Sequence, residues 1–266
     1  MSQTWPVSGV LGLAVVVLAI ALGRSRARIG TLREALEAKS NDLEHMQISF
    51  ARFAPEEVVE RIVASGVSTH GERKEVTALF ADLVGFTALS EQLEPDTLVR
   101  ILNGYFERMS RAITEHRGHI ATFVGDGILA LFGALQPNPW QANDAAHAAL
   151  AMRAELEAYN RELEAQQLPR LAFGVGLHRG VGVAGLVGSR DLMQFTFVGR
   201  TVNLAARIQG LTRTHDADIL LTGAVRVLLD PRFQLRELPA TEVRGIAEPV
   251  PIFAADGFDP ATQPSR

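Results

Sequence analysis

The chain has 266 residues, which is enough for one sizeable globular domain with accessory segments. Its formal net charge of −4 argues against a nucleic-acid partner, because such partners normally select a basic surface. The absence of cysteine excludes disulfides, thiolate metal sites and cysteine nucleophiles.

The first 23 residues have the pattern of a transmembrane helix. No residue from 7 to 22 is charged, Trp5 precedes this run, and the first basic residue is Arg24. A helix over 5–23 would be about 28 Å long, which nearly spans a hydrocarbon core of roughly 30 Å. Basic residues lie only on its C-terminal side, so the positive-inside rule predicts a single-pass anchor in the inner (plasma) membrane, with the rest of the chain cytoplasmic.

A cleaved signal peptide is the alternative for this segment, because Ala19-Ile20-Ala21 resembles a cleavage site. Signal peptides, however, carry their positive charge before the apolar run. Here no lysine or arginine precedes residue 24. We therefore expect an uncleaved anchor over 1–23.

Residues 24–66 are predicted to form a helical linker. Between residues 29 and 50, apolar residues recur at alternating spacings of three and four, as in a coiled coil. Lys39 is the one polar residue in this series. A parallel coiled coil would join two anchors to two following domains; the alternative is one amphipathic helix lying on the domain. A short helix over 53–66 ends at Gly66. The heptad positions are Ile29, Leu32, Leu36, Lys39, Leu43, Met46 and Phe50.

Residues 70–253 alternate between strand and helix patterns. We expect a turn at 178–180, short strands and one helix over 218–253, and a flexible tail over 254–266. This mixed order predicts an α+β fold with helices on an antiparallel-rich sheet. The expected strands are about 76–82, 119–124, 127–132, 171–177, 181–187 and 193–198, and the expected helices are about 95–116, 141–165 and 201–212.

Two acidic residues follow apolar, strand-like runs. Asp82 precedes a turn with Gly85, and Asp126 lies between Gly125 and Gly127. Carboxylates at strand ends can hold hard cations, and a glycine turn before a helix binds anions. The alternatives are a helix cap for Asp82 and an ordinary hairpin turn for Asp126. If the strands pair, both carboxylates meet at one sheet edge, as two-metal phosphoryl chemistry requires.

A third motif lies on the predicted helix 201–212. Asn203 and Arg207 are four residues apart, so they share one face of the helix. The pair could contact a sugar and a transferring phosphate, because arginine stays charged and can make two contacts to a phosphate. The alternative is a surface arginine with a helix-initiating asparagine.

Together these motifs resemble a known family. FADLVGFT (80–87), FVGDGILALFG (123–133) and FVGRTVNLAARI (197–208) look like the signature segments of class III nucleotidyl cyclases, the adenylate and guanylate cyclases. The resemblance covers roughly residues 70–253. It implies a ferredoxin-like α+β catalytic domain that acts as a head-to-tail homodimer with active sites between subunits. An N-terminal anchor and helical linker are common in bacterial members.

The resemblance also implies roles for individual residues. One chain would bind two Mg²⁺ or Mn²⁺ ions per active site, and the other chain would supply the catalytic Asn203 and Arg207. Arg244 matches a position that usually holds a phosphate-binding lysine. The implied metal-binding residues are Asp82, Leu83 and Asp126, and the implied substrate-binding residues are Val84, Gly85, Phe86, Thr87, Thr122, Thr196 and Arg244.

The positions that would select the base depart from the family pattern. Thr122 stands where many adenylate cyclases have lysine, and Thr196 stands where the partner residue is often aspartate. Hydroxyl groups both donate and accept hydrogen bonds, so base selection is open. We expect an adenylate cyclase that makes 3′,5′-cyclic AMP and pyrophosphate from ATP in intracellular signalling. The alternatives are a guanylate or dual-specificity cyclase and a degenerate, non-catalytic module for dimerisation or nucleotide binding.

Overall fold

A computed structural model describes Lys39 and residues 71–188, 193–244 and 246–261. The expected anchor (1–23) lies outside these residues, as does the expected linker (24–66) apart from Lys39. Within the described ranges, no helix combines the length and apolar character that a membrane crossing needs.

Strands and helices alternate along the described domain, and they confirm the expected α+β class. The helix expected over 141–165 and the strand expected over 193–198 have the predicted limits. In chain order the elements are β1 (Glu72–Leu83), α3 (Phe86–Ser90), α4 (Pro95–Glu115), β2 (Gly118–Val124), β3 (Gly127–Phe132), α5 (Gln141–Ala165), β4 (Phe173–Gly188), β5 (Met193–Val198), α6 (Arg200–Gly210), the 3-10 helix η1 (Leu211–Arg213), β6 (Ile219–Thr222), α7 (Gly223–Arg226), β7 (Phe233–Thr241) and β8 (Val250–Phe258).

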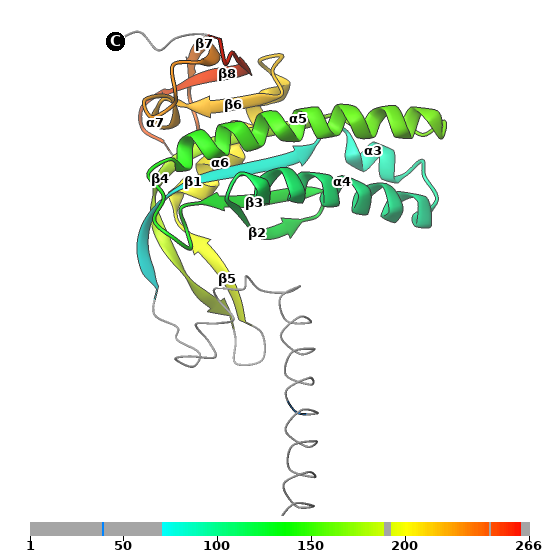
Figure 1. Ribbon diagram of the computed structural model, residues 1–266, viewed down its shortest axis with the longest axis horizontal. Helices are drawn as coiled ribbons and strands as arrows, with labels where there is room; N and C mark the ends of the chain where they lie inside the picture. The colour runs from blue at the N-terminus through cyan, green and yellow to red at the C-terminus, as the bar shows by residue number, and fades with distance from the viewer. Residues whose placement is uncertain (1–38, 40–70, 189–192, 245, 262–266) are drawn as a thin grey trace, which may run out of the picture. The chain divides into compact units, whose positions relative to one another are not determined.

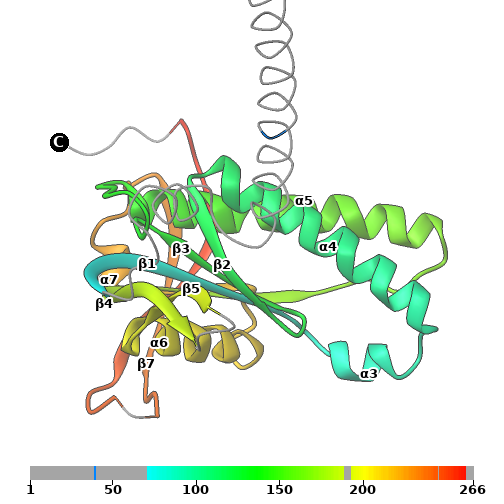
Figure 2. The ribbon, with the colours of Figure 1, turned by 90° about the horizontal axis from the view of Figure 1, so that it is seen from below.

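The strands form one mixed sheet with helices on both faces (Figure 1). The strand order is β2-β3-β1-β4-β6-β8-β7, and β5 pairs with β4 as a projecting hairpin. The β4–β6 pairing is parallel, whereas the other pairings are antiparallel. Figure 2 shows α4 and α5 on one face and α6 on the other. The expectation of an antiparallel-rich sheet is confirmed.

Side-chain alternation along β1 decides which way Asp82 points. Leu79, Ala81 and Leu83 belong to the larger core, which α4 and α5 cover. Val76 and Ala78 belong to a second core with Ala205 of α6. Because side chains alternate between faces along a strand, Asp82 emerges on the face that carries α6.

The turn expected at 178–180 is wrong, because β4 is one unbroken strand over 173–188. It pairs with β1 without a register shift, from Glu72 opposite Ala184 to Leu83 opposite Phe173. Gly180, which suggested the turn, lies within this strand, and a Cβ there would crowd Thr201 of α6. Gly176 of the same strand serves helix packing in a similar way. A Cβ on Gly176 would overlap the backbone of Ala205 and Gln209 in α6. Glycine here lets the helix approach the sheet closely.

The start of the expected tail is also wrong. β8 continues to Phe258, and it pairs with β7 up to Phe233. Ala254 and Ala255 in this strand are buried. Residues 254–258 therefore belong to the folded sheet, and residues 262–266 lie outside the described ranges.

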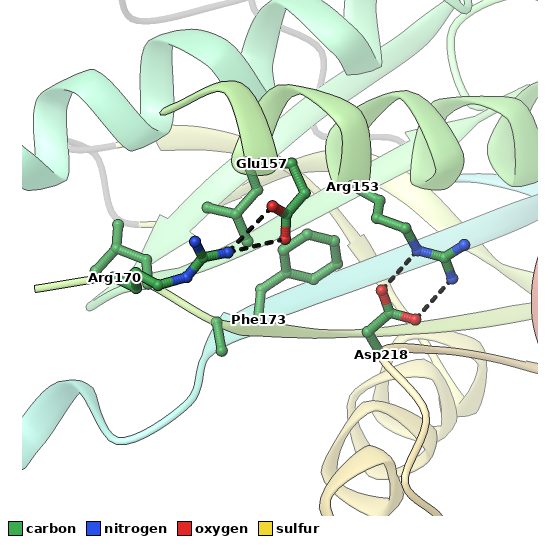
Figure 3. Close-up of a pocket in the computed structure, with 8 residues that line it drawn as sticks. Arg153, Glu157, Arg170, Phe173 and Asp218 are labelled. Atoms are coloured by element: carbon green, nitrogen blue, oxygen red, sulfur yellow. Dashed lines mark hydrogen bonds and ion pairs between the residues drawn. The ribbon is translucent and has the colours of Figure 1, made fainter. Parts of the chain in front are cut away.

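One arginine on α5 ties this helix to the β6–β8 part of the sheet. Arg153 donates hydrogen bonds of 2.6 Å to both carboxylate oxygens of Asp218, just before β6. It also donates to the backbone oxygens of Ala255 (2.7 Å) and Asp256 (3.0 Å). The two bonds to Asp218 are drawn in Figure 3. Such bidentate, charge-assisted contacts are among the stronger polar interactions in proteins.

We expect Arg153→Ala to lower the free energy of unfolding by about 2 to 4 kcal/mol, because it leaves a carboxylate and two carbonyls without their donor. Denaturant unfolding would measure the loss. Arg170→Ala is the matched control. Arg170 pairs with Glu157 and Glu164, but its side chain is 51% exposed. That variant should cost about 1 kcal/mol or less. Equal losses for the two variants would contradict the conclusion that Arg153 stabilises the fold more than a surface arginine does.

Candidate active site

The two acids of the sequence motifs meet at one edge of the sheet. Asp82 is near the end of β1, and Asp126 is in the two-residue loop between β2 and β3. The hairpin reaches β1 because β3 pairs with it, with Ala81 opposite Ile128. The backbone N–H of Leu83 then donates to Oδ2 of Asp126 at 3.2 Å.

The electrostatics of this acid pair favour a bound cation. Burial raises the pKa of Asp82 to about 6, and the negative charge of Asp126 and a hydrogen bond between the two carboxyl groups act in the same direction. The positive charge of Arg213 opposes this shift without cancelling it. Arg213 thus balances only part of the negative charge of the two carboxylates. Such a pair of oxygen ligands suits the hard cations Mg²⁺ and Mn²⁺.

The two carboxylates alone do not complete the coordination shell of a divalent metal ion. No cluster of three or more histidine or acidic side chains with metal-binding geometry occurs within the described ranges. Mg²⁺ commonly takes one or two carboxylates and completes its shell with water and substrate phosphates. The residues present therefore fit a cation that is shared with a phosphorylated substrate.

Asp82→Asn is expected to stabilise the metal-free chain at pH 8 by about 1 to 2 kcal/mol, a figure reduced for partial solvent exposure. The pKa of Asp82 is raised in the folded state, so wild-type stability falls as the pH rises from about 4 to about 6. The gain should therefore disappear at pH 4. Denaturant unfolding in chelator at both pH values would measure it. Asp96→Asn, at an exposed position on α4, is the control; a loss of stability at pH 8 for Asp82→Asn alone would contradict the expectation.

The turn after β1 leaves the start of the next helix without a side-chain cap. Helix α3 begins after Gly85, which has φ of 72°, and no side chain caps it. The structure thus does not support the alternative that Asp82 caps this helix. The N–H of Val84 donates to Ala172 at 2.8 Å, so the donors available for an anion are those of the next residues, including Phe86 and Thr87.

The residues expected to act from the other chain form a second cluster. Asn203 and Arg207 lie on the exposed face of α6, and Arg207 donates to the backbone oxygen of Arg244 in the loop after β7. In the part of the chain that the structure describes, neither Asn203 nor Arg207 has a hydrogen bond or ion pair with Asp82 or Asp126. Within one chain, the acid pair and the Asn203–Arg207 pair are therefore not joined by polar contacts.

The two threonines expected to contact a base lie on different strands. Thr122 is half-buried on β2, and its hydroxyl donates to the backbone oxygen of Phe123 at 3.2 Å. Thr196 is on β5 opposite Gly185, and its side chain lies outside the described part.

Arg213 is the residue near the acids that the sequence motifs miss. It lies on η1, directly after α6, and its guanidinium is 3.8 Å from Asp82. Its segment, LTRTH, has no local pattern that distinguishes it from an ordinary surface arginine. Only the packing of η1 against β4 brings it to the end of β1.

Two hollows lie near this end of the sheet. The first, of about 510 Å³, is lined by Val84 and Arg213 among others but by neither acid, and Arg213 connects it to Asp82. The second, of about 270 Å³, is shown in Figure 3. Its Arg153 and Arg170 are already paired with carboxylates that line the same hollow, so its charges are satisfied internally.

Comparison with known proteins decides the family. Residues 69–254 match the family described as "Adenylate and Guanylate cyclase catalytic domain", nearly the expected span of 70–253. The chain belongs to this family. An adenylate cyclase of Anabaena cylindrica is 34% identical over 243 residues, which cover 87% of this chain and 47% of that relative. The chain therefore spans about half the length of this curated relative.

Two solved cyclase structures resemble the domain. The crystal structure of the guanylyl cyclase Cya2 is 32% identical, with a TM-score of 0.66, and the alignment covers 73% of this chain and 98% of Cya2. The adenylyl cyclase CyaB from P. aeruginosa is 29% identical, with a TM-score of 0.68, and the alignment covers 73% of this chain and 100% of CyaB. Similarity to one protein of each type confirms the class III catalytic domain but does not select the base.

Proposed function

We propose that this chain is an adenylate cyclase that converts ATP to 3′,5′-cyclic AMP and pyrophosphate in intracellular signalling. The observation that carries the proposal is the meeting of Asp82 and Asp126 at the end of β1, beside the glycine turn that opens α3. A cyclase needs this combination, because the acids hold divalent cations and the turn holds the phosphates that share them.

In the proposed reaction the ribose 3′-oxygen attacks the α-phosphorus, and the bond from that phosphorus to the bridging oxygen of the β-phosphate breaks. Two Mg²⁺ or Mn²⁺ ions would supply charge neutralisation and a more acidic 3′-hydroxyl. Asp82, Asp126 and Leu83 would hold the ions, and the backbone donors of 85–87 would orient the triphosphate. The protein contributes mainly positioning and electrostatic stabilisation.

The second cluster would act on the substrate of a partner subunit. Asn203 would orient the ribose, and Arg207 and Arg244 would stabilise charge on the phosphates. A homodimer is supported by the lack of a hydrogen bond or ion pair between this cluster and the acids within the described chain. It is also supported by exposed apolar side chains on the β4–β5 hairpin, because exposed apolar patches often mark protein–protein interfaces. These are Val181, Val183, Val187 and Val198, which are 41–55% exposed.

ATP is the favoured substrate. The Thr122 hydroxyl donates its hydrogen to Phe123, so its oxygen is left as an acceptor. An acceptor suits the exocyclic amine of adenine better than the carbonyl oxygen of guanine. The 34% identity to an adenylate cyclase points the same way. A guanylate or dual-specificity cyclase is the second candidate, supported by the similarity to Cya2.

Product analysis tests the proposed function. The full chain, purified in detergent, would be incubated with ATP and with GTP separately in Mg²⁺ or Mn²⁺. We expect cyclic AMP to be the main product. Cyclic GMP as the main product would move the assignment to the second candidate. A folded chain that binds nucleotide but forms neither product would identify a degenerate module.

Residues 1–23 are proposed to anchor the chain in the inner membrane, with the catalytic domain in the cytoplasm. The support is their uncharged run followed by Arg24. We expect the chain to stay in the membrane pellet after washing at alkaline pH, and a chain lacking residues 1–23 to be released. Release of the full chain by the same wash would contradict anchoring.

A further inference from the structure

A guanidinium nitrogen faces the oxygens that are proposed to hold a metal ion. Nη2 of Arg213 is 3.8 Å from Oδ2 of Asp82 and 3.5 Å from the backbone oxygen of Leu83. These are two of the three proposed metal-binding residues. The chain thus places one of its own positive charges where a divalent cation would have to bind.

The backbone of Arg213 is held in this position by packing. Its neighbour Thr212 is buried and donates to the backbone oxygen of Gln209 at 2.7 Å. Thr212 also packs directly on Gly174, where a Cβ would overlap its hydroxyl. Gly174 is the residue of β4 opposite Asp82. The close approach of η1 to β4 therefore fixes the start of the arginine side chain beside the acid.

The guanidinium itself is easy to displace. The Arg213 side chain is 53% exposed, and the separations of 3.5 and 3.8 Å are long for a hydrogen bond. An exposed ion pair of this kind contributes little to stability. A divalent cation carries twice the charge and approaches carboxylate oxygens to about 2 Å, so it outcompetes the guanidinium.

We propose that Arg213 is a resident counter-ion of the acid pair, which a divalent cation must displace before catalysis. The inference rests on the proposed function, because it takes Asp82 and Asp126 as the metal site. Arg213 lowers the metal affinity of the nucleotide-free chain while partly relieving the repulsion between the acids. After displacement the guanidinium remains in the hollow that Val84 also lines, next to the turn expected to hold phosphates.

Mn²⁺ binding to the full, nucleotide-free chain tests this proposal without relying on activity. Free Mn²⁺ would be measured by electron paramagnetic resonance during a titration. Arg213→Gln should bind Mn²⁺ about three- to tenfold more tightly than wild type, because one positive charge near the ion is gone. Arg213→Lys should stay close to wild type, because the charge remains. Arg161→Gln, at an exposed position on α5, is the charge-matched control and should change little.

Asp82→Asn separates this inference from the function on which it rests. If Asp82→Asn binds Mn²⁺ as wild type does, the proposed metal site itself is wrong. A second outcome is that Asp82→Asn loses Mn²⁺ binding but Arg213→Gln binds Mn²⁺ no more tightly than Arg161→Gln. The metal site would then be supported, and the proposed counter-ion role of Arg213 would be refuted. Circular dichroism of each variant would show that it is folded, and Arg213→Met provides a second neutral variant to repeat the comparison.

Discussion

An equimolar mixture of Asp82→Ala and Arg207→Ala chains is expected to regain activity that neither variant has alone. In the proposed dimer, each site takes its acids from one chain and Asn203 and Arg207 from the other. A mixed dimer therefore has one site with both defects and one site with none. Random pairing makes half of the dimers mixed, so about a quarter of wild-type activity should return.

The control mixture combines Asp82→Ala with Asp126→Ala. Both substitutions affect the acid half, which a single chain contributes through β1 and the β2–β3 hairpin. Every site in every dimer is then defective, and no activity should return. Chains should be co-expressed or mixed under conditions that allow dimers to exchange. If the Asp82→Ala and Arg207→Ala mixture stays inactive although mixed dimers form, the two halves do not belong to different chains.

Removing either acid is expected to produce the largest single loss of activity. We expect Asp82→Ala and Asp126→Ala each to lower kcat by about 10³-fold or more, since the electrostatic stabilisation of the transferring phosphate depends on the cations they hold. Initial rates of cyclic nucleotide formation at saturating ATP, over a range of Mn²⁺ concentrations, would measure the loss.

Asp96→Ala provides the comparison for these variants. Asp96 is an exposed acid in the first turn of α4, and its removal changes the net charge by the same amount. This variant should retain most of the wild-type rate. A comparable loss in Asp96→Ala, or a loss of less than about tenfold in Asp82→Ala, would contradict the role of the acid pair as the metal site.

Sequence patterns predicted the acid half of the site because its determinants are local. Apolar runs before Asp82 and Asp126 predicted buried strands, and the glycines around Asp126 predicted a hairpin. The end of β1 is buried as expected, whereas β2 is only partly buried and Phe123 and Val124 at its end are exposed. Pairing of β3 with β1 then brings the carboxyl groups together. The limits of α5 were predicted correctly because its alanine- and leucine-rich sequence has no competing turn signal.

The features that sequence patterns missed depend on contacts between distant segments. Gly180 suggested a turn, whereas β4 continues through it and a Cβ there would crowd Thr201 of α6. Arg213 reaches Asp82 only because Thr212 packs on Gly174. No local periodicity records such a contact. The division of the site between two chains is likewise invisible in the pattern of one chain and came from the family resemblance.

The shared site would be seen in an anomalous diffraction map of crystals grown with Mn²⁺ and a nonhydrolysable ATP analogue. We expect Mn²⁺ peaks within coordination distance of Asp82 and Asp126 of one subunit, with Arg207 of the partner subunit against the α-phosphate. A map with no peak at these carboxylates, or with the nucleotide contacted by Arg207 of the same chain, would contradict the shared site.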